Sequence, residues 1–238
     1  MASRRVDAGG RVVTPAAGDG SADAGSPAGG LDAAFVRRWV AALEAMVTDA
    51  EGRLTELDAA IGDADHGTNM TRGLRAATAT LDAGSTAGPA DACRETGLAL
   101  TRAIGGASGP LYGTVFVAMG DALPPGAEVS ADELAAALRE GLRAVQRLGA
   151  AVAGDKTMID AIAPAVAELE QRLVEGSSLP EALALAAVAA ERGAEATVPM
   201  RARKGRASYL GARSEGHQDP GATSSAMLFE AMSRAVRP

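Results

Sequence analysis

Aromatic residues make up only 3% of this 238-residue chain, although 47% of its residues are apolar. Its core must therefore be built from alanine, leucine and valine, which suit closely packed helices. Runs of alternating Val, Ile, Tyr or Thr with tight hairpin turns are also missing, so strands are not expected. These absences predict an all-α protein.

Cysteine, positive charge and long apolar runs are also scarce. One cysteine, Cys93, excludes an internal disulfide and a zinc site with several cysteine ligands, and its apolar helical surroundings favour a core thiol over a catalytic one. The formal net charge of −7 argues against direct nucleic-acid binding. No apolar run reaches the roughly 20 residues of a membrane span, and no apolar segment of an export signal follows Arg4 and Arg5. We therefore expect a soluble cytoplasmic protein without membrane contacts.

The chain divides into a short tail and one domain. Residues 1–30 are rich in Gly, Ala, Ser, Pro and Asp, and cannot bury enough surface to offset the entropy of ordering them. We expect a disordered tail there and one helical domain over residues 31–238. Apolar periodicity, capping residues and helix breakers predict eight helices. Their expected bounds are about 31–57, 69–82, 88–104, 111–122, 131–148, 159–174, 180–198 and 221–235.

Glycine and charge are concentrated in every second connection between these helices. In an up-and-down bundle of antiparallel helices, alternate loops lie at the same end. The loops at 58–68, 105–110, 149–158 and 201–221 are therefore expected to converge on one mouth.

The first of these loops, LDAAIGDADHGTNM, crowds Asp58, Asp63 and Asp65 together. Asp63 and Asp65 are two residues apart, so an extended segment would point both to one side. Two carboxylates about 4 Å apart repel by roughly 4 kcal/mol at an effective dielectric of 20, and a divalent cation would turn this repulsion into attraction. Hard oxygen ligands suit Mg²⁺ or Ca²⁺ rather than zinc.

The spacing of the aspartates does not fit a calcium-binding EF-hand, because Leu74 stands where the twelfth position needs glutamate. Magnesium usually takes few carboxylates and completes its shell with water and phosphate oxygens, so the cluster points to a phosphorylated ligand. The alternative, helix-capping aspartates in a solvated loop, explains one or two of the three.

Two glycine-rich turns precede helices and are candidate phosphate contacts. After the aspartates, Gly67 would let the backbone approach a ligand and Thr68 could cap the helix, whose free N–H groups favour an anion. His66 is either a ligand contact or a hydrogen-bonded structural residue. In GGASGP, residues 105–110, Ser108 offers a hydroxyl, although glycines there also permit close helix packing.

The third loop, GDKTMID, precedes another helix, for which Thr157 or Asp160 is a candidate cap. Met158 either lines an apolar slot, such as one for a base, or belongs to the core. Asp219 caps the last helix or hydrogen-bonds a ligand.

The fourth loop is basic. Its positive charges form a solvated face, neutralise phosphates or dock an acidic partner. They come from Arg201, Arg203, Lys204 and Arg206.

The motifs GDADHGTNM, GGASGPLYGT, GDKTMIDAI and YLGARSEGHQDPGATSS follow one another in the order found in a known family. From about residue 31 onward, the chain closely resembles the nucleotide-binding L subunits of dihydroxyacetone kinases. The resemblance implies a barrel of eight antiparallel helices with ADP and two Mg²⁺ ions at one end. It implies that Asp58, Asp63 and Asp65 are the metal ligands. It assigns the nucleotide to His66, Gly67, Thr68, Asn69, Ala107, Ser108, Gly149, Met158, Arg206, Asp219, Pro220 and Gly221.

The resemblance also implies partners and a reaction. In this family a separate K subunit holds dihydroxyacetone covalently on a histidine, so no catalytic side chain is expected in this chain. In one version K and L modules are fused and ATP is consumed. In the other, a phosphohistidine-bearing M subunit rephosphorylates bound ADP to ATP. Because no K-like domain accompanies this sequence, the phosphotransferase-dependent version is expected.

Two other functions stay open. One is an ATP-dependent kinase module for another ketose or a fatty-acid acceptor. The other is a nucleotide-sensing partner of a transcriptional regulator.

Overall fold

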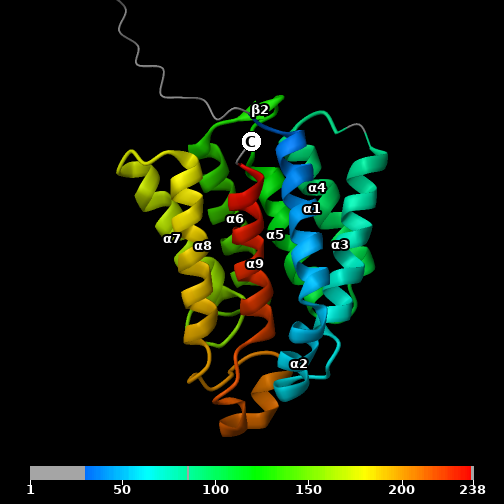
Figure 1. The fold of residues 1–238 in the computed structure, drawn as a ribbon, viewed down its shortest axis with the longest axis vertical. Helices are drawn as coiled ribbons and strands as arrows, with labels where there is room; N and C mark the ends of the chain where they lie inside the picture. The colour runs from blue at the N-terminus through cyan, green and yellow to red at the C-terminus, as the bar shows by residue number, and fades with distance from the viewer. Residues whose placement is uncertain (1–29, 85, 237–238) are drawn as a thin grey trace, which may run out of the picture.

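The computed structural model describes residues 30–84 and 86–236. The expected disordered tail, residues 1–30, lies outside this range apart from Gly30, so both the tail and its boundary stay predictions. Figure 1 shows the described part of the chain as a set of long helices with loops gathered at the two ends.

Helices make up almost all the regular structure of these residues, which confirms the all-α class. The two strands, of two residues each, pair antiparallel with Leu31 opposite Val129. The elements in chain order are β1 (Leu31–Asp32), α1 (Ala33–Asp49), α2 (Glu51–Ile61), α3 (His66–Ala83), α4 (Pro89–Ala103), α5 (Ser108–Ala122), β2 (Glu128–Val129), α6 (Ala131–Gly149), α7 (Ile159–Val174), α8 (Leu179–Ala196), the 3₁₀ helix η1 (Arg206–Ser214) and α9 (Pro220–Ala235).

The first expected helix is in fact two helices. The prediction of one helix over about 31–57 is wrong, because Ala50 interrupts it with φ −96° and ψ 7°. No glycine or proline marks the break, so sequence periodicity does not reveal it. Tertiary packing accounts for the direction of α2, whose Ile61 joins a small apolar cluster with Ala202 and Ala207 beside η1.

The remaining helices pack in sequence around one core. Each of α3 to α8 packs against the next helix, α1 packs against α3, and α9 packs back against α1, which closes a ring of neighbours. In Figure 1, α2 and the orange η1 segment lie together at the lower end, where the chain passes from α8 to α9. Alternate connections therefore share one end of the molecule, and α2 and η1 border that end.

Local signals in the sequence explain several helix starts. Ser130 and Glu133 form the expected capping box at the start of α6, and Pro180 lies in the first turn of α8. The expected loop over 201–216 instead contains η1, which bends at Gly211 where φ is 56°. Cys93 is buried in the core, and burial raises the pKa of its thiol to about 12, in agreement with a structural role.

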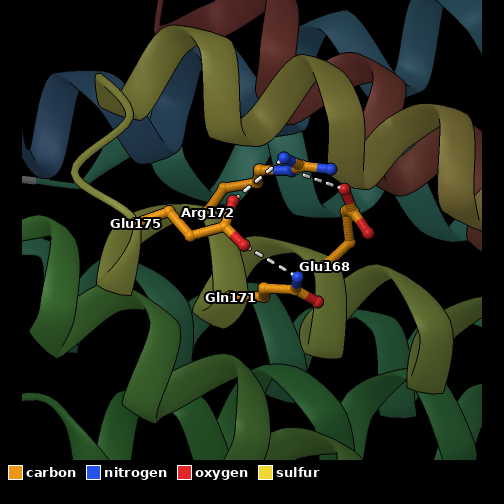
Figure 2. Close-up of polar contacts among 4 residues, drawn as sticks. All are labelled: Glu168, Gln171, Arg172 and Glu175. Carbon is orange, nitrogen blue, oxygen red and sulfur yellow. Dashed lines mark hydrogen bonds and ion pairs between the residues drawn. The ribbon is translucent and has the colours of Figure 1, made fainter.

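The outer face of α7 carries partly exposed charge pairs. Arg172 pairs with Glu168 at 2.7 Å and with Glu175 at 3.0 Å, and Gln171 donates to Glu175, as Figure 2 shows. Such exposed pairs contribute about 0–1 kcal/mol each, so this network marks the solvent side of α7 and adds little to stability. Within the described residues, no helix has the combination of length and apolarity that crossing a membrane requires.

One tryptophan links three helices in the core. Trp39 of α1 is fully buried, its ring centroid lies 5.0 Å from that of Phe116 in α5, and its Nε1 donates to the carbonyl of Leu228 in α9 at 2.9 Å. Because aromatic side chains bury a large apolar area each, this residue contributes a large share of the packing in a core with few aromatic rings.

The substitution Trp39→Phe should lower the free energy of unfolding by roughly 1–3 kcal/mol, because it removes buried volume and one hydrogen bond. Urea denaturation followed by circular dichroism measures this loss. Val174→Ala is the control, since Val174 is 89% exposed and its truncation should change stability by less than about 0.5 kcal/mol. An equal effect of both substitutions would contradict the role of Trp39.

Candidate functional site

A cavity of about 630 Å³ opens at the end of the ring where α2, α4, α6 and α8 finish. All four loops that were expected to converge contribute to its lining, so the prediction of a shared mouth is confirmed. The predicted site residues that line it are Asp58, Asp63, Asp65, His66, Ala107, Ser108, Gly149, Met158, Arg206, Asp219, Pro220 and Gly221. Of the predicted set, Gly67, Thr68 and Asn69 are not part of this lining.

The three aspartates form a group that fits a hard metal ion. One carboxylate oxygen of each lies within 4.8 Å of the others, and Asp58 is buried while Asp63 and Asp65 are exposed. The Oδ2 atom of Asp58 accepts hydrogen bonds from the backbone N–H groups of Asp65 and His66, at 2.9 and 3.1 Å. This fixes one carboxylate and leaves acidic oxygens that suit Mg²⁺.

The backbone between the aspartates is a turn rather than the expected extended segment. Ala64 has φ 62°, a left-handed conformation that costs energy for a residue with a side chain. The extended-strand argument for the grouping is therefore wrong, although the grouping itself exists. The hydrogen bonds to Asp58 close the turn in place of strand geometry.

A glycine provides the space for the buried carboxylate. A Cβ atom at Gly62 would lie 2.0 Å from Oδ1 of Asp58, well inside contact distance. Any other residue at this position would displace the carboxylate that the two backbone N–H groups hold. Gly62 is thus part of the acidic turn, a role that the sequence motif alone does not specify.

The η1 segment, which packs against α2, brings a positive charge to the aspartates. Arg206, in η1, forms an ion pair with Asp63 at 3.0 Å, and its side chain is 69% exposed. An ion pair this exposed contributes at most about 1 kcal/mol, so it is easily exchanged for another anion such as a phosphate.

His66 is both a structural residue and part of the cavity lining. Its Nε2 atom lies 2.8 Å from Oγ of Ser224, and its Nδ1 atom lies 3.4 Å from Oγ of Ser108. Burial lowers the pKa of His66, while Asp58 and Asp65 act in the opposite direction. The ring is therefore neutral near pH 7 and acts as a hydrogen-bonding group rather than a cation.

The next three residues face α2 and α3 rather than the cavity. A Cβ atom at Gly67 would lie 2.2 Å from the carbonyl oxygen of Glu51, so this glycine permits close packing of α3 on α2. Thr68 donates to the Glu51 carboxylate at 3.3 Å, and Asn69 accepts from Arg72 at 2.6 Å. Their route to a ligand would be through backbone N–H groups in the first turn of α3.

Another part of the cavity lining is built around Asp219. Its carboxylate caps α9 by accepting from the backbone N–H of Ala222 at 2.7 Å, so the capping interpretation is confirmed. Burial raises the pKa of Asp219 to about 7, and Lys156 acts against this rise. Neither Thr157 nor Asp160 caps α7, whose N-cap position is Met158. Asp160 lies in the first turn of α7, accepts from the backbone N–H of Thr157 at 2.8 Å and supports the loop that carries Met158.

Sequence reasoning missed two buried residues of this site. Tyr112 donates to the carbonyl of Gly221 at 3.0 Å and its hydroxyl also lies within 3 Å of Ser224 and Ser225, while burial raises its pKa to about 12. Lys156 is 1% exposed. It belongs to the GDKTMID motif, in which only Thr157, Met158 and Asp160 are predicted to have a role. The sequence signal that could have identified it is the rarity of lysine, since the chain contains only Lys156 and Lys204.

Known proteins with similar sequences identify the family of this chain. Residues 60–234 match the family model described as the DAK2 domain. The chain is 44% identical over 184 residues to the ADP-binding subunit DhaL of the PEP-dependent dihydroxyacetone kinase of Escherichia coli (strain K12), covering 77% of this chain and 88% of that subunit. It is 40% identical over 201 residues to a Listeria innocua ADP-binding subunit DhaL of PEP-dependent dihydroxyacetone kinase 2, covering 84% and 93% of the two chains.

A solved structure gives the same result. The dihydroxyacetone kinase of C. freundii in its native form superposes with a TM-score of 0.66 at 30% identity, covering 98% of this chain. This chain spans 39% of the length of that kinase. A second structure, of the C. freundii kinase in complex with AMP-PNP and Mg²⁺, has a TM-score of 0.64. With its matched DAK2 domain and these relatives, the chain belongs to the family of dihydroxyacetone kinase L subunits.

Proposed function

We propose that this chain is the ADP-binding subunit of a phosphoenolpyruvate-dependent dihydroxyacetone kinase. It would transfer a phosphoryl group from a Mg²⁺-bound nucleotide to dihydroxyacetone held by a separate K subunit, giving dihydroxyacetone phosphate. The observation that carries the proposal is the acidic turn, with three carboxylates within 4.8 Å, at the edge of a cavity of about 630 Å³. The names of the relatives that align over 88% and 93% of their length support it.

Phosphoryl transfer depends on neutralising charge and aligning the reacting groups rather than on a protein nucleophile. Asp58, Asp63 and Asp65 would hold magnesium, which when bound supplies positive charge next to the phosphate oxygens. Arg206 lies 3.0 Å from Asp63 and would add a second positive charge to the same phosphates. The first turn of α3 would direct backbone N–H groups at them.

The other wall of the cavity would orient the rest of the nucleotide. Met158 is 5% exposed and lines the cavity together with Val145, which offers an apolar surface for a base. Asp219, Pro220 and Gly221 form the start of α9 on the same side and would provide polar contacts. Gly149 and the Ala107–Ser108 turn complete the predicted contacts. No side chain of this chain is assigned a covalent or acid–base step.

The partners follow from this reaction. A K subunit would present the ketose at the mouth, and a phosphohistidine-bearing M subunit would convert bound ADP back to ATP. Two magnesium ions, a cytoplasmic location and the lack of direct nucleic-acid binding belong to the same proposal.

Another ketose is the second candidate acceptor. A D-erythrulose kinase of Mycolicibacterium smegmatis is 37% identical over 212 residues, but this chain spans only 36% of its length. Because the acceptor would be held by the K subunit, kinase assays with the matching K protein and both ketoses decide between them. A pull-down that recovers a DNA-binding regulator instead would favour the sensing function.

Protein purified without added nucleotide should retain ADP through gel filtration, since a coenzyme that is rephosphorylated in place need not exchange. Mass spectrometry of the nucleotide released by denaturation identifies it. An empty site that binds ATP and releases ADP at each turnover would instead indicate the ATP-consuming reaction.

Asp63→Asn should weaken Mg²⁺-dependent ADP binding by roughly tenfold or more, because it removes one acidic ligand from the trio. Isothermal titration calorimetry with ADP, with and without Mg²⁺, measures the change, and circular dichroism should be unaltered. Glu175→Gln, on the outer face of α7, serves as the control and should bind like the unaltered protein. Full retention of Mg²⁺-dependent binding in Asp63→Asn would refute the metal assignment.

Gly62→Ala should cause a similar loss, of roughly tenfold in Mg²⁺-dependent ADP affinity, because its Cβ would displace the Asp58 carboxylate. Gly52→Ala is a matched control in the same helix region, since a Cβ at Gly52 has nothing within 4 Å. That control should bind ADP normally and gain up to about 1 kcal/mol of helix stability. The same titrations, with thermal melts, compare the two variants, and equal affinities would show that Gly62 is dispensable.

A further inference from the structure

Lysine is rare in this chain, and its two lysines lie at the same place. Lysine and arginine together number 23, yet only Lys156 and Lys204 are lysines, and both line the cavity. Their surroundings differ, since Lys204 is partly exposed whereas Lys156 is 1% exposed. Burying an ammonium group is costly unless hydrogen bonds and opposite charge compensate it. The groups that offset the cost of burying the Lys156 ammonium therefore indicate its role.

The backbone directs Lys156 into the protein. Gly154, two residues before it, has φ 90°, and Lys156 itself has φ 63°, a left-handed conformation unfavourable for a lysine. Its Nζ atom donates to the carbonyl of Thr197 at 2.8 Å and to the carbonyl of His217. These acceptors lie at the two ends of the connection between α8 and α9, so one side chain joins the α6–α7 loop to both ends of that connection.

The same contacts continue to Asp219. The hydroxyl of Thr197 accepts from the backbone N–H of Asp219 at 2.9 Å. Thr197 therefore links the two residues: its carbonyl accepts from Lys156, and its side chain accepts from Asp219. The ammonium charge also attracts the buried Asp219 carboxylate and opposes the rise in its pKa. Asp219 in turn caps α9 and lines the cavity.

We propose that Lys156 is the positioning residue of the nucleotide-binding wall, acting through Thr197 and Asp219 rather than by contacting phosphates. The proposal rests on the proposed function, since it assumes that the cavity holds a nucleotide. A lysine near glycine in a phosphate-binding loop commonly binds phosphate directly. Here two of its three N–H donors are engaged by carbonyl oxygens. Arg206, together with a magnesium ion held by the acidic turn, would supply the positive charge next to the phosphates.

A double-mutant cycle tests whether Lys156 acts through Asp219. Lys156→Met, Asp219→Asn and the double variant are titrated with ADP in excess Mg²⁺ by calorimetry. Each single substitution should weaken ADP binding by roughly tenfold. Lys156→Met leaves the carbonyl groups of Thr197 and His217 without their donor, and Asp219→Asn removes the negative charge that caps α9. The ADP affinity of the double variant should lie within about threefold of that of Asp219→Asn alone, since the interaction between the two positions is already lost in the single variant.

Arg147→Met is the matched control, because Arg147 is an exposed cation at the end of α6 and does not line the cavity. Its ADP affinity should stay within about twofold of the unaltered protein, as expected for a screened surface charge. Losses that add fully in the double variant, or a Lys156→Met affinity equal to that of the control, would overturn the proposal. Failure of the unaltered protein to bind ADP would instead overturn the proposed function.

A chemical measurement on the unaltered protein guards against poor folding of Lys156→Met. Acetylation by N-hydroxysuccinimidyl acetate, followed by peptide mass spectrometry, should modify Lys204 roughly tenfold faster than Lys156, because a hydrogen-bonded buried amine reacts only after local opening. Equal rates would show that the Lys156 ammonium is not held by the two carbonyl groups, and the positioning role would be excluded.

Discussion

The Asp58 carboxylate is the interaction on which the mouth of the molecule depends. By accepting from two successive backbone N–H groups, it closes the turn between α2 and α3 and fixes the first residue of α3. Gly62 makes room for that carboxylate, and Ala64 takes up the unfavourable backbone angle that the closed turn requires. One side chain thus sets the direction of α3 and brings two further carboxylates to the same point.

The ring of helices provides the frame that makes this local arrangement useful. Helices that alternate in direction deliver every second loop to the same end, so residues more than 150 positions apart in the sequence meet around one cavity. A hydrogen bond between His66, which lines that cavity, and Ser224 joins the start of α3 directly to the first turns of α9. The loops can therefore differ in chemistry, acidic on one side and basic on another, while the small side chains of the core keep the helices close.

Motifs made most of the site predictable, and packing explains what they missed. The aspartates, Ser108, Met158 and Asp219 were identified because each belongs to a run of residue types suited to binding next to a helix start. The sequence predicts that Gly67 lets the backbone approach a ligand, and this stays a prediction; the structure shows that its lack of a side chain permits the close contact between α3 and Glu51. A glycine that admits a ligand and a glycine that permits close helix packing look the same in the sequence. Only the atoms that a Cβ would meet in the structure distinguish the two roles.

The misses in the fold have the same origin. The break at Ala50 and the left-handed angles at Ala64 and Lys156 occur at residues without a local preference for them. Contacts made by distant segments impose these conformations, and a single sequence read along its length does not contain those contacts. Where a local code exists, as in the capping box at Ser130 and the cap at Asp219, prediction and structure agree.

The burial of the chain's one tryptophan has a practical consequence for spectroscopy. Trp39 is fully enclosed by the core and is not part of the cavity lining. Its fluorescence should therefore be emitted at short wavelength and report loss of the whole tertiary structure, while events at the mouth leave it almost silent. An optical assay for occupancy of the mouth would need a fluorescent nucleotide analogue or a dye introduced near η1.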